Sequence, residues 1–271
     1  MASEVIAGGF GEMRSASTAG GGTALTTTAG FILLPKSVTQ VMITPLTFVT
    51  AVVAKWCFNP WLVVLKSTDL MVTMPTDYSS AAQDADTSTD VVLSSLDTLA
   101  NSGLLLIGSH LPFRGCSVDV DAPNAGAAST LSVHYWKSDS TWASITPTDG
   151  TASGGKTFAV DGNVTWTVPS DWVTVKLKEV YASVPVNSLT NAELYWTRWT
   201  VSAVLDSDTT LNSLVAMNRS TAYSEWLSGQ CFEEHINKGI NGVGCIEALT
   251  DAGTANLIVN VAVSRDVGRF T

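Results

Sequence analysis

The stretches HYWKSDSTW (residues 134–142), TPTDGTASGGKTFAVDGNVTWTVPSDW (146–172) and ELYWTRWTVS (193–202) decide the fold of this chain. Together they contain six of its nine tryptophans, and each of the six stands beside a run of β-favouring residues or a turn signal. Rings of this size fill the space between two packed sheets. The three stretches therefore predict an antiparallel β-sandwich with an aromatic core.

The sequence around these stretches carries the same β pattern. Short β-favouring runs separated by Gly, Pro, Asp and Asn continue from residue 31 to residue 205, and those at residues 70–75, 156–160 and 173–182 are expected to be strands like the others. In LSVHYW (131–136), alternation puts residues 131, 133 and 135 on one face of a strand and residues 132, 134 and 136 on the other. The chain is thus expected to be all-β, built from antiparallel sandwich or jelly-roll domains.

Three regions are expected along the chain. Residues 1–30 are rich in Gly, Ala, Ser and Thr, and they form either a flexible arm that becomes ordered only against a partner or a flexible leader with no role. Residues 31–115 form an N-terminal β domain, and residues 116–271 form the Trp-rich sandwich domain.

Two segments outside the sandwich pattern favour short helices. DVVLSSLDTLANSG (90–103) ends in a helix-terminating Asn-Ser-Gly, and the segment 207–229 has apolar residues at a spacing that fits one or two helical turns. The alternating NLIVNVAVSRDV (256–267) is a strand that returns to pair in one of the sheets.

Composition excludes several classes of function. Apolar residues make up 45% of the chain and charged residues only 14%, whereas an ordinary soluble domain has about 25% charged residues. The net charge is −10 and the basic residues are scattered singly, so we expect no nucleic-acid partner. No apolar run reaches 18 residues, so we expect no membrane insertion. The first residues lack a secretory signal, so a protein of this kind that acts outside the cell is expected to be assembled in the cytoplasm and to leave by another route, such as lysis.

The chain carries no recognisable catalytic or cofactor motif. There is no G-x-S-x-G elbow and no phosphate-binding glycine loop, so we expect no enzymatic activity and no cofactor. The four cysteines are expected to be free thiols. Cys231, His235 and Cys245 do not have a usual zinc spacing, and no metal site is expected.

The order of the motifs between residues 103 and 205 resembles a β-sandwich module of tailed-bacteriophage virion proteins. The motifs are LSVHYW (131–136), WASI (142–145), TDGT (148–151), GKTF (155–158), DGNVTWTVPSDW (161–172) and YWTRWTVS (195–202). Similar proteins serve as capsid decoration proteins, minor capsid components and tail or fibre parts, and some related sandwiches bind carbohydrate. The resemblance implies a virion structural protein that forms homo-oligomers, with a trimer as one expectation.

Two placements on the particle follow from this resemblance. The compact, repeat-free chain with its arm favours a capsid decoration protein that binds the major capsid protein and copies of itself, and so stabilises the shell. The alternative is a tail or fibre component that binds host-surface glycan. Its candidate ligand contacts are Trp136, Trp142 and Trp172, because these rings lie next to turns and could stack on sugars. The favoured alternative is that the three rings belong to the core, since buried aromatic rings hold such sandwiches together. A glycan-cleaving enzyme would also need a pair of acids across a cleft, and the sequence singles out no such pair.

Overall fold

The protein is divided into two compact units that differ from the expected domains. The computed structural model describes residues 11–15, 22–34, 38–84, 88–94, 96–236, 239–240 and 242–264. The first unit comprises residues 1–59 and 221–271, and the second comprises residues 60–220. The predicted boundary between residues 115 and 116 instead falls inside a single strand, Phe113–Ala122. The second unit is therefore an insertion within the first.

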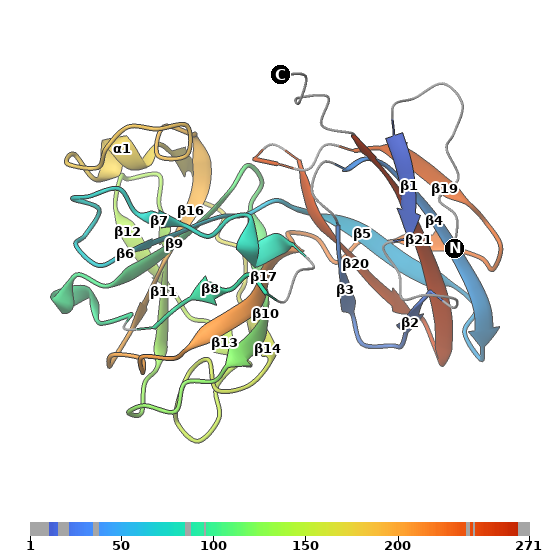
Figure 1. The fold of residues 1–271 in the computed structure, drawn as a ribbon, viewed down its shortest axis with the longest axis horizontal. Coiled ribbons are helices and arrows are strands. Elements are labelled where there is room, and N and C mark those ends of the chain that lie inside the picture. The colour runs from blue at the N-terminus through green and yellow to red at the C-terminus, as the bar shows by residue number, and fades with distance from the viewer. Residues whose placement is uncertain are drawn as a thin grey trace. The chain divides into compact units, whose positions relative to one another are not determined.

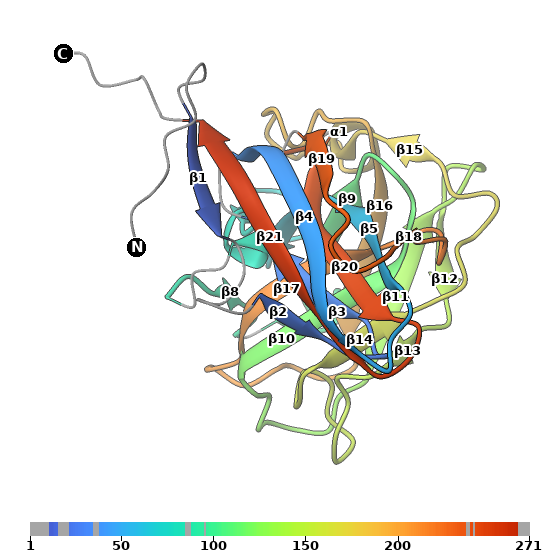
Figure 2. The same ribbon diagram turned by 90° about the vertical axis from the view of Figure 1, so that its right-hand side faces the viewer.

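The first unit is a two-sheet sandwich with jelly-roll connectivity. One sheet has the strand order β1-β21-β4-β19, with β2 also paired to β21, and the other has the order β18-β5-β20-β3 (Figures 1 and 2). The strands are β1 Gly11–Ser15, β2 Thr23–Leu25, β3 Gly30–Leu33, β4 Val38–Val49, β5 Ala54–Pro60, β18 Ser224–Trp226, β19 Phe232–His235, β20 Val243–Thr250 and β21 Thr254–Ser264.

This strand order is that of the double-sheet jelly roll. β1 and β2 run along the same edge of β21 and act as one interrupted strand. Counted in this way, the described residues of the unit form eight strands. The first, eighth, third and sixth of them form one sheet, and the second, seventh, fourth and fifth form the other. Two sheets with this connectivity define a jelly roll. The second unit lies between the fourth strand, β5, and the fifth, β18.

Alternation along the strands builds the core of the first unit. In β4, Val41 and Ile43 are fully buried, and in β21, Leu257, Val259 and Val261 are fully buried. These residues pack in one cluster with side chains of the opposite sheet. The indole ring of Trp56 stacks on that of Trp226 at 5.2 Å between centroids. Burial of one face of each sheet thus holds the two layers together.

Both ends of the described chain belong to the first sheet. The alternating C-terminal segment forms β21 and pairs with β4, as predicted. The predicted arm differs from the structure, because Gly11–Ser15 and Thr23–Leu25 are strands that pair with β21 of the same chain. Backbone hydrogen bonding to a neighbouring edge can order a segment that has few apolar side chains. Residues 1–10 and 16–21 of that arm lie outside the described residues.

The second unit is also a two-sheet antiparallel sandwich (Figure 1). One sheet has the strand order β13-β14-β10-β17-β8, and the other has the order β12-β11-β16-β9-β6-β7, with β15 paired to β16. The strands are β6 Val63–Ser67, β7 Thr76–Asp77, β8 Val91–Val92, β9 Leu104–Ser109, β10 Phe113–Ala122, β11 Leu131–Trp136, β12 Trp142–Ile145, β13 Thr148–Asp149, β14 Gly162–Thr165, β15 Thr174–Val175, β16 Leu194–Val201 and β17 Thr210–Asn218.

The aromatic core predicted from the tryptophan-rich stretches lies between these two sheets. Trp199 is fully buried, and its ring meets that of Trp166 edge to face at 6.2 Å and that of Phe158 stacked at 6.4 Å. The predicted alternation in β11 is confirmed: residues 131, 133 and 135 are buried in this core, and residues 132, 134 and 136 are not. The large sheet therefore turns one face inward and presents Trp136 on the other.

Several local predictions were wrong. The segment expected to be helical at 207–229 contains strands β17 and β18, because the apolar run in β17 is buried against the sandwich core. Residues 70–75 and 157–160 form turns and bends rather than strands. The expected strand at 173–182 is divided into β15 and the short helix α1, Leu177–Val180. The segment predicted to be helical at 90–103 contains strand β8 as well as one helical turn, η2, Leu99–Asn101. A second helical turn is η1, Ala81–Gln83. In the part of the chain that the structure describes, no helix is long and apolar enough to span a membrane.

Candidate functional site

Two tryptophans lie on the outer face of the large sheet of the second unit. Trp136 of β11 and Trp142 of β12 are cross-strand partners, and their rings meet edge to face at 5.3 Å between centroids. Both side chains are half-buried. The pair therefore keeps part of its aromatic surface accessible.

An arginine extends from the neighbouring strand toward this pair. Arg198 of β16 is the cross-strand partner of His134, and its guanidinium carbon lies 4.9 Å from the centre of the Trp142 ring. The side chains of Arg198 and Trp142 thus meet over β11, which lies between their two strands. A guanidinium over an indole ring is attracted by the negative face of the ring and loses conformational freedom. The structure therefore holds Arg198 in a fixed position beside the two tryptophans.

Two buried polar atoms in this cluster lack a hydrogen-bond partner. They are Nε of Arg198 and Nδ1 of His134, whereas the hydroxyl of Tyr181, which follows α1, interacts with the side chains of Arg198 and Trp142. A buried polar group without a partner costs about 1–3 kcal/mol, and such groups are rare in folded proteins. Both atoms are closed to solvent, so the accessible part of the cluster consists of the two half-buried rings and the rest of the guanidinium.

The electrostatics of the cluster are positive. Burial lowers the pKa of His134, and the neighbouring Arg198 guanidinium lowers it further, so His134 is neutral near pH 7. Burial raises the pKa of the Tyr181 phenol, and the charge of Arg198 together with side-chain hydrogen bonding to Arg198 and Trp142 opposes that effect. Among the described residues, Arg198 forms no ion pair with a carboxylate. The cluster therefore presents a full positive charge and hydrogen-bond donors with no negative counterpart.

Trp172, the third predicted ligand contact, lies in the core instead. Its side chain is only 5% exposed, and its ring packs against Phe113 at 5.2 Å and Tyr195 at 5.7 Å. Its indole nitrogen donates a hydrogen bond to the carbonyl of Trp196. Trp172 is therefore a core residue, and its proximity to a turn misled the prediction. The other members of the cluster were not predicted. The pairing of β11 with β16 brings His134 and Arg198 together, and Tyr181 comes from the segment after α1.

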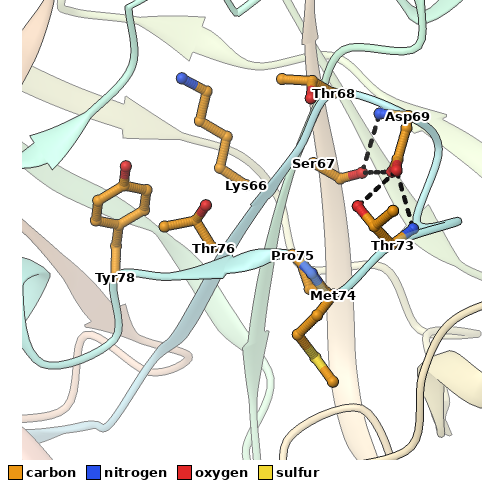
Figure 3. Close-up of a pocket in the computed structure, with 9 residues that line it drawn as sticks. All are labelled: Lys66, Ser67, Thr68, Asp69, Thr73, Met74, Pro75, Thr76 and Tyr78. Carbon is orange, nitrogen blue, oxygen red and sulfur yellow. Dashed lines mark hydrogen bonds between the residues drawn. The ribbon is translucent and has the colours of Figure 1, made fainter.

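A polar pocket of about 190 Å³ lies elsewhere in the second unit, between β6, β7 and the loop that joins them (Figure 3). Its lining residues are Lys66, Ser67, Thr68, Asp69, Thr73, Met74, Pro75, Thr76 and Tyr78. Burial lowers the pKa of Lys66 and raises that of Tyr78. The hydrogen bond from the Thr73 hydroxyl is the largest cause that lowers the pKa of Asp69.

The charged groups of this pocket are used to hold the fold. The Lys66 ammonium donates hydrogen bonds to the carbonyls of Val92 and Ser94. The two oxygens of Asp69 accept four hydrogen bonds from the side chain of Ser67, the backbone of Val72, and the backbone and hydroxyl of Thr73. Figure 3 shows the contacts of Asp69 with Ser67 and Thr73 on the side of the pocket away from Lys66. The pocket therefore fixes the loop, and the cluster around Arg198 is the stronger candidate site.

Comparison with known proteins adds no assignment: no protein-family model matches the chain, and no curated protein matches its sequence.

In the part of the chain that the structure describes, no group of three His, Cys, Asp or Glu side chains is arranged to hold a metal ion. Cys116 and Cys245 are buried thiols, and Cys231 is exposed.

Proposed function

We propose that the protein is a non-enzymatic structural component of a phage virion that binds the outer surface of the major capsid shell and stabilises it. The observation that carries the proposal is the eight-stranded jelly roll of the first unit, an architecture used by viral capsid and lectin domains. Because a fold does not by itself define a function, the low charge content and the virion-like motif order of the second unit are needed as independent support.

A rigid apolar loop of the second unit supports contact with another protein. Leu70, Val72 and Met74 are 39%, 57% and 45% exposed, respectively. Leu70 and Met71 have positive φ values of 54° and 66°, which are costly for residues with a side chain. The Asp69 carboxylate stabilises this loop through its hydrogen bonds. A loop that is held in a strained form and presents apolar side chains to solvent fits a contact surface, and the proposed partner is the major capsid protein.

The proposal is tested with phage particles assembled without this protein. They are expected to lose infectivity at lower temperature and after milder osmotic shock than complete particles, and added purified protein is expected to restore their resistance. Particles that keep full heat and osmotic resistance without the protein would contradict a stabilising role.

The second candidate function is glycan binding by a tail or fibre component. The half-buried pair of Trp136 and Trp142 beside Arg198 favours it, since aromatic rings with an adjacent polar group are suited to sugars. The burial of Trp172 reduces the predicted three-ring platform to two rings. Binding of purified protein to host cells, abolished by changes at Trp136 and Trp142, would support this function.

A further inference from the structure

We infer that one sheet of the first unit provides the surface through which two copies of this chain associate. The sheet is formed by β1, β2, β21, β4 and β19, and its outer face is the one opposite the core (Figure 2). This association is independent of the proposed shell contact, because it joins copies of the chain to each other. The side-chain chemistry, the charge and the area of the outer face all fit a second copy as its partner.

The two central strands of this sheet turn alternate residues outward. Val41 and Ile43 of β4 and Val259 of β21 are fully buried in the core. The residues between them are half-buried and form cross-strand pairs on the outer face. These pairs are Gln40 with Ala262, Met42 with Asn260, Thr44 with Ile258, and Leu46 with Asn256. The outer face thus combines apolar side chains with amides and a hydroxyl, and the pair of Thr44 and Ile258 lies near its centre.

The centre of the outer face carries no charge. The sequences of the two central strands, VTQVMITPLTFV in β4 and TANLIVNVAVS in β21, contain no charged residue. At the edge of the face, the carboxylate of Glu233 accepts a hydrogen bond from the side-chain amide of Gln40. In the second unit, by contrast, the long strand β10 exposes Asp119 and Asp121. Depletion of charge is typical of the core of a protein interface, and two chains of net charge −10 approach at the lowest electrostatic cost through uncharged surfaces.

The polar groups of the outer face are self-complementary. A two-fold interface brings the same patch of two copies together, so each group must be able to pair with groups of its own kind. Amides and hydroxyls both donate and accept hydrogen bonds, whereas two carboxylates or two ammonium groups repel each other. Within the described residues, the side-chain amides of Asn256 and Asn260 have no hydrogen-bond partner. These amides can therefore pair across a two-fold interface.

The area of the outer face is close to what a stable dimer needs. β4 and β21 contain 12 and 11 residues, and β1, β2 and β19 contain 5, 3 and 4. With about 3.4 Å per residue and about 4.8 Å between strands, the face covers about 570 Å². Two copies would bury about 1,100 Å² of flat area, and the relief of the side chains brings this value to the range of specific interfaces, which begins at about 1,200 Å². Two sheets packed face to face are also a common arrangement in β-proteins.

The test measures the mass of the full-length protein by sedimentation velocity at concentrations from about 1 to about 100 μM. We expect a dimer of about 57 kDa, which is twice the 28.5 kDa of the chain, with a dissociation constant of about 10 μM or lower. A two-fold contact closes on itself, so it predicts this dimer instead of the trimer that the resemblance to virion proteins implied.

Charge variants at the centre of the face identify the surface. Thr44→Lys and Thr44→Glu each bring two like charges together and are expected to weaken association about 100-fold. An equal mixture of the two variants is expected to restore the dimer, because the facing charges then have opposite signs. This recovery also shows that both variants are folded, and the same pair of changes at Ile258 repeats the test on the neighbouring strand. The matched control Ser132→Glu changes an exposed residue of β11 in the second unit and is expected to leave association unchanged.

Four results would overturn the inference. A protein that stays monomeric at about 100 μM does not associate through any surface of this kind. A trimer would contradict the two-fold contact, and a dimer that survives the charge variants at Thr44 and Ile258 would place the contact elsewhere. Charge variants that stay monomeric when mixed would show that the two faces do not meet. If the unchanged protein is monomeric and Thr44→Glu weakens its binding to capsid shells, the face belongs to the shell contact. None of these results decides whether the protein stabilises the shell, which the heat and osmotic resistance of the particles tests separately.

Discussion

Replacement of Gly108 by alanine should destabilise the second unit, because the large sheet has no room for a side chain at this position. Gly108 of β9 is the cross-strand partner of Trp196, and an added Cβ would lie 2.6 Å from two carbons of the indole ring. Ordinary contacts of a Cβ begin at 3.4 Å, so the ring must move by about 0.8 Å. Trp196 is fully buried, and its indole nitrogen donates a 2.9 Å hydrogen bond to the carbonyl of Val175.

The expected loss of stability combines three contributions. Overpacking of a core costs about 1–3 kcal/mol, and weakening of the Trp196 hydrogen bond costs about 1 kcal/mol. The smaller entropy of alanine in the unfolded chain offsets up to about 1 kcal/mol. We therefore expect a net loss of about 1–4 kcal/mol, which lowers the midpoint of thermal unfolding by about 2–16 °C in a unit of this size.

Differential scanning calorimetry checks this value. The matched control is Gly30→Ala in β3, where the nearest atom to an added Cβ is a carbonyl oxygen at 4.0 Å, and we expect little change or a slight gain in stability. If Gly108→Ala unfolds within about 1 °C of the unchanged protein, the tight packing of Trp196 against β9 is refuted.

Four further predictions concern the tryptophans, Gln83, the loop held by Asp69 and the thiols. Trp172→Ala should cost about 3–5 kcal/mol in chemical denaturation and Trp136→Ala only about 1 kcal/mol, and equal costs would contradict the assignment of Trp172 to the core. Gln83→Ala should cost about 2–4 kcal/mol, because this buried amide bonds three backbone groups, and a cost near zero would contradict that role. The pKa of the Asp69 carboxyl is lowered in the folded state, so its charged form stabilises the fold above the ordinary pKa of 3.8, and this stabilisation is lost as the pH falls through the pKa of the folded state. Asp69→Asn should therefore make the loop that Asp69 holds more susceptible to proteolysis at neutral pH. Unchanged cleavage would contradict the role of Asp69 in holding the loop. Cys231 should react first with a thiol reagent and the two buried cysteines only on unfolding, so fast reaction of a buried thiol would contradict the packing.

The sequence was sufficient for the class of fold and for the strands with clear alternation. LSVHYW and the C-terminal alternating run became β11 and β21 because a period of two and one buried face leave little freedom of register. The insertion of one unit into the other was not predictable. It depends on β20 and β21 pairing with β3 and β4 across the whole length of the inserted unit, and such pairing leaves no local signal. The apolar run of β17 was also ambiguous, because short buried runs have no distinctive period.

The candidate site could be predicted in part. Alternation placed Trp136 on the outer face, and the same rule applied to YWTRWT would have put Arg198 on one face of its strand. The sequence does not state that β11 and β16 are neighbours or that Arg198 reaches Trp142, because these facts depend on sheet order. Trp172 was misplaced since a nearby turn does not indicate on which side of the backbone a ring packs.

Localisation on the particle tests the central claim most directly. Purified virions are labelled with an antibody against this chain that carries gold, and the labels are located by electron microscopy. A shell-binding protein predicts gold distributed over the heads of the particles. Gold confined to the tails would contradict the capsid placement, and virions without label would contradict a structural role in the particle.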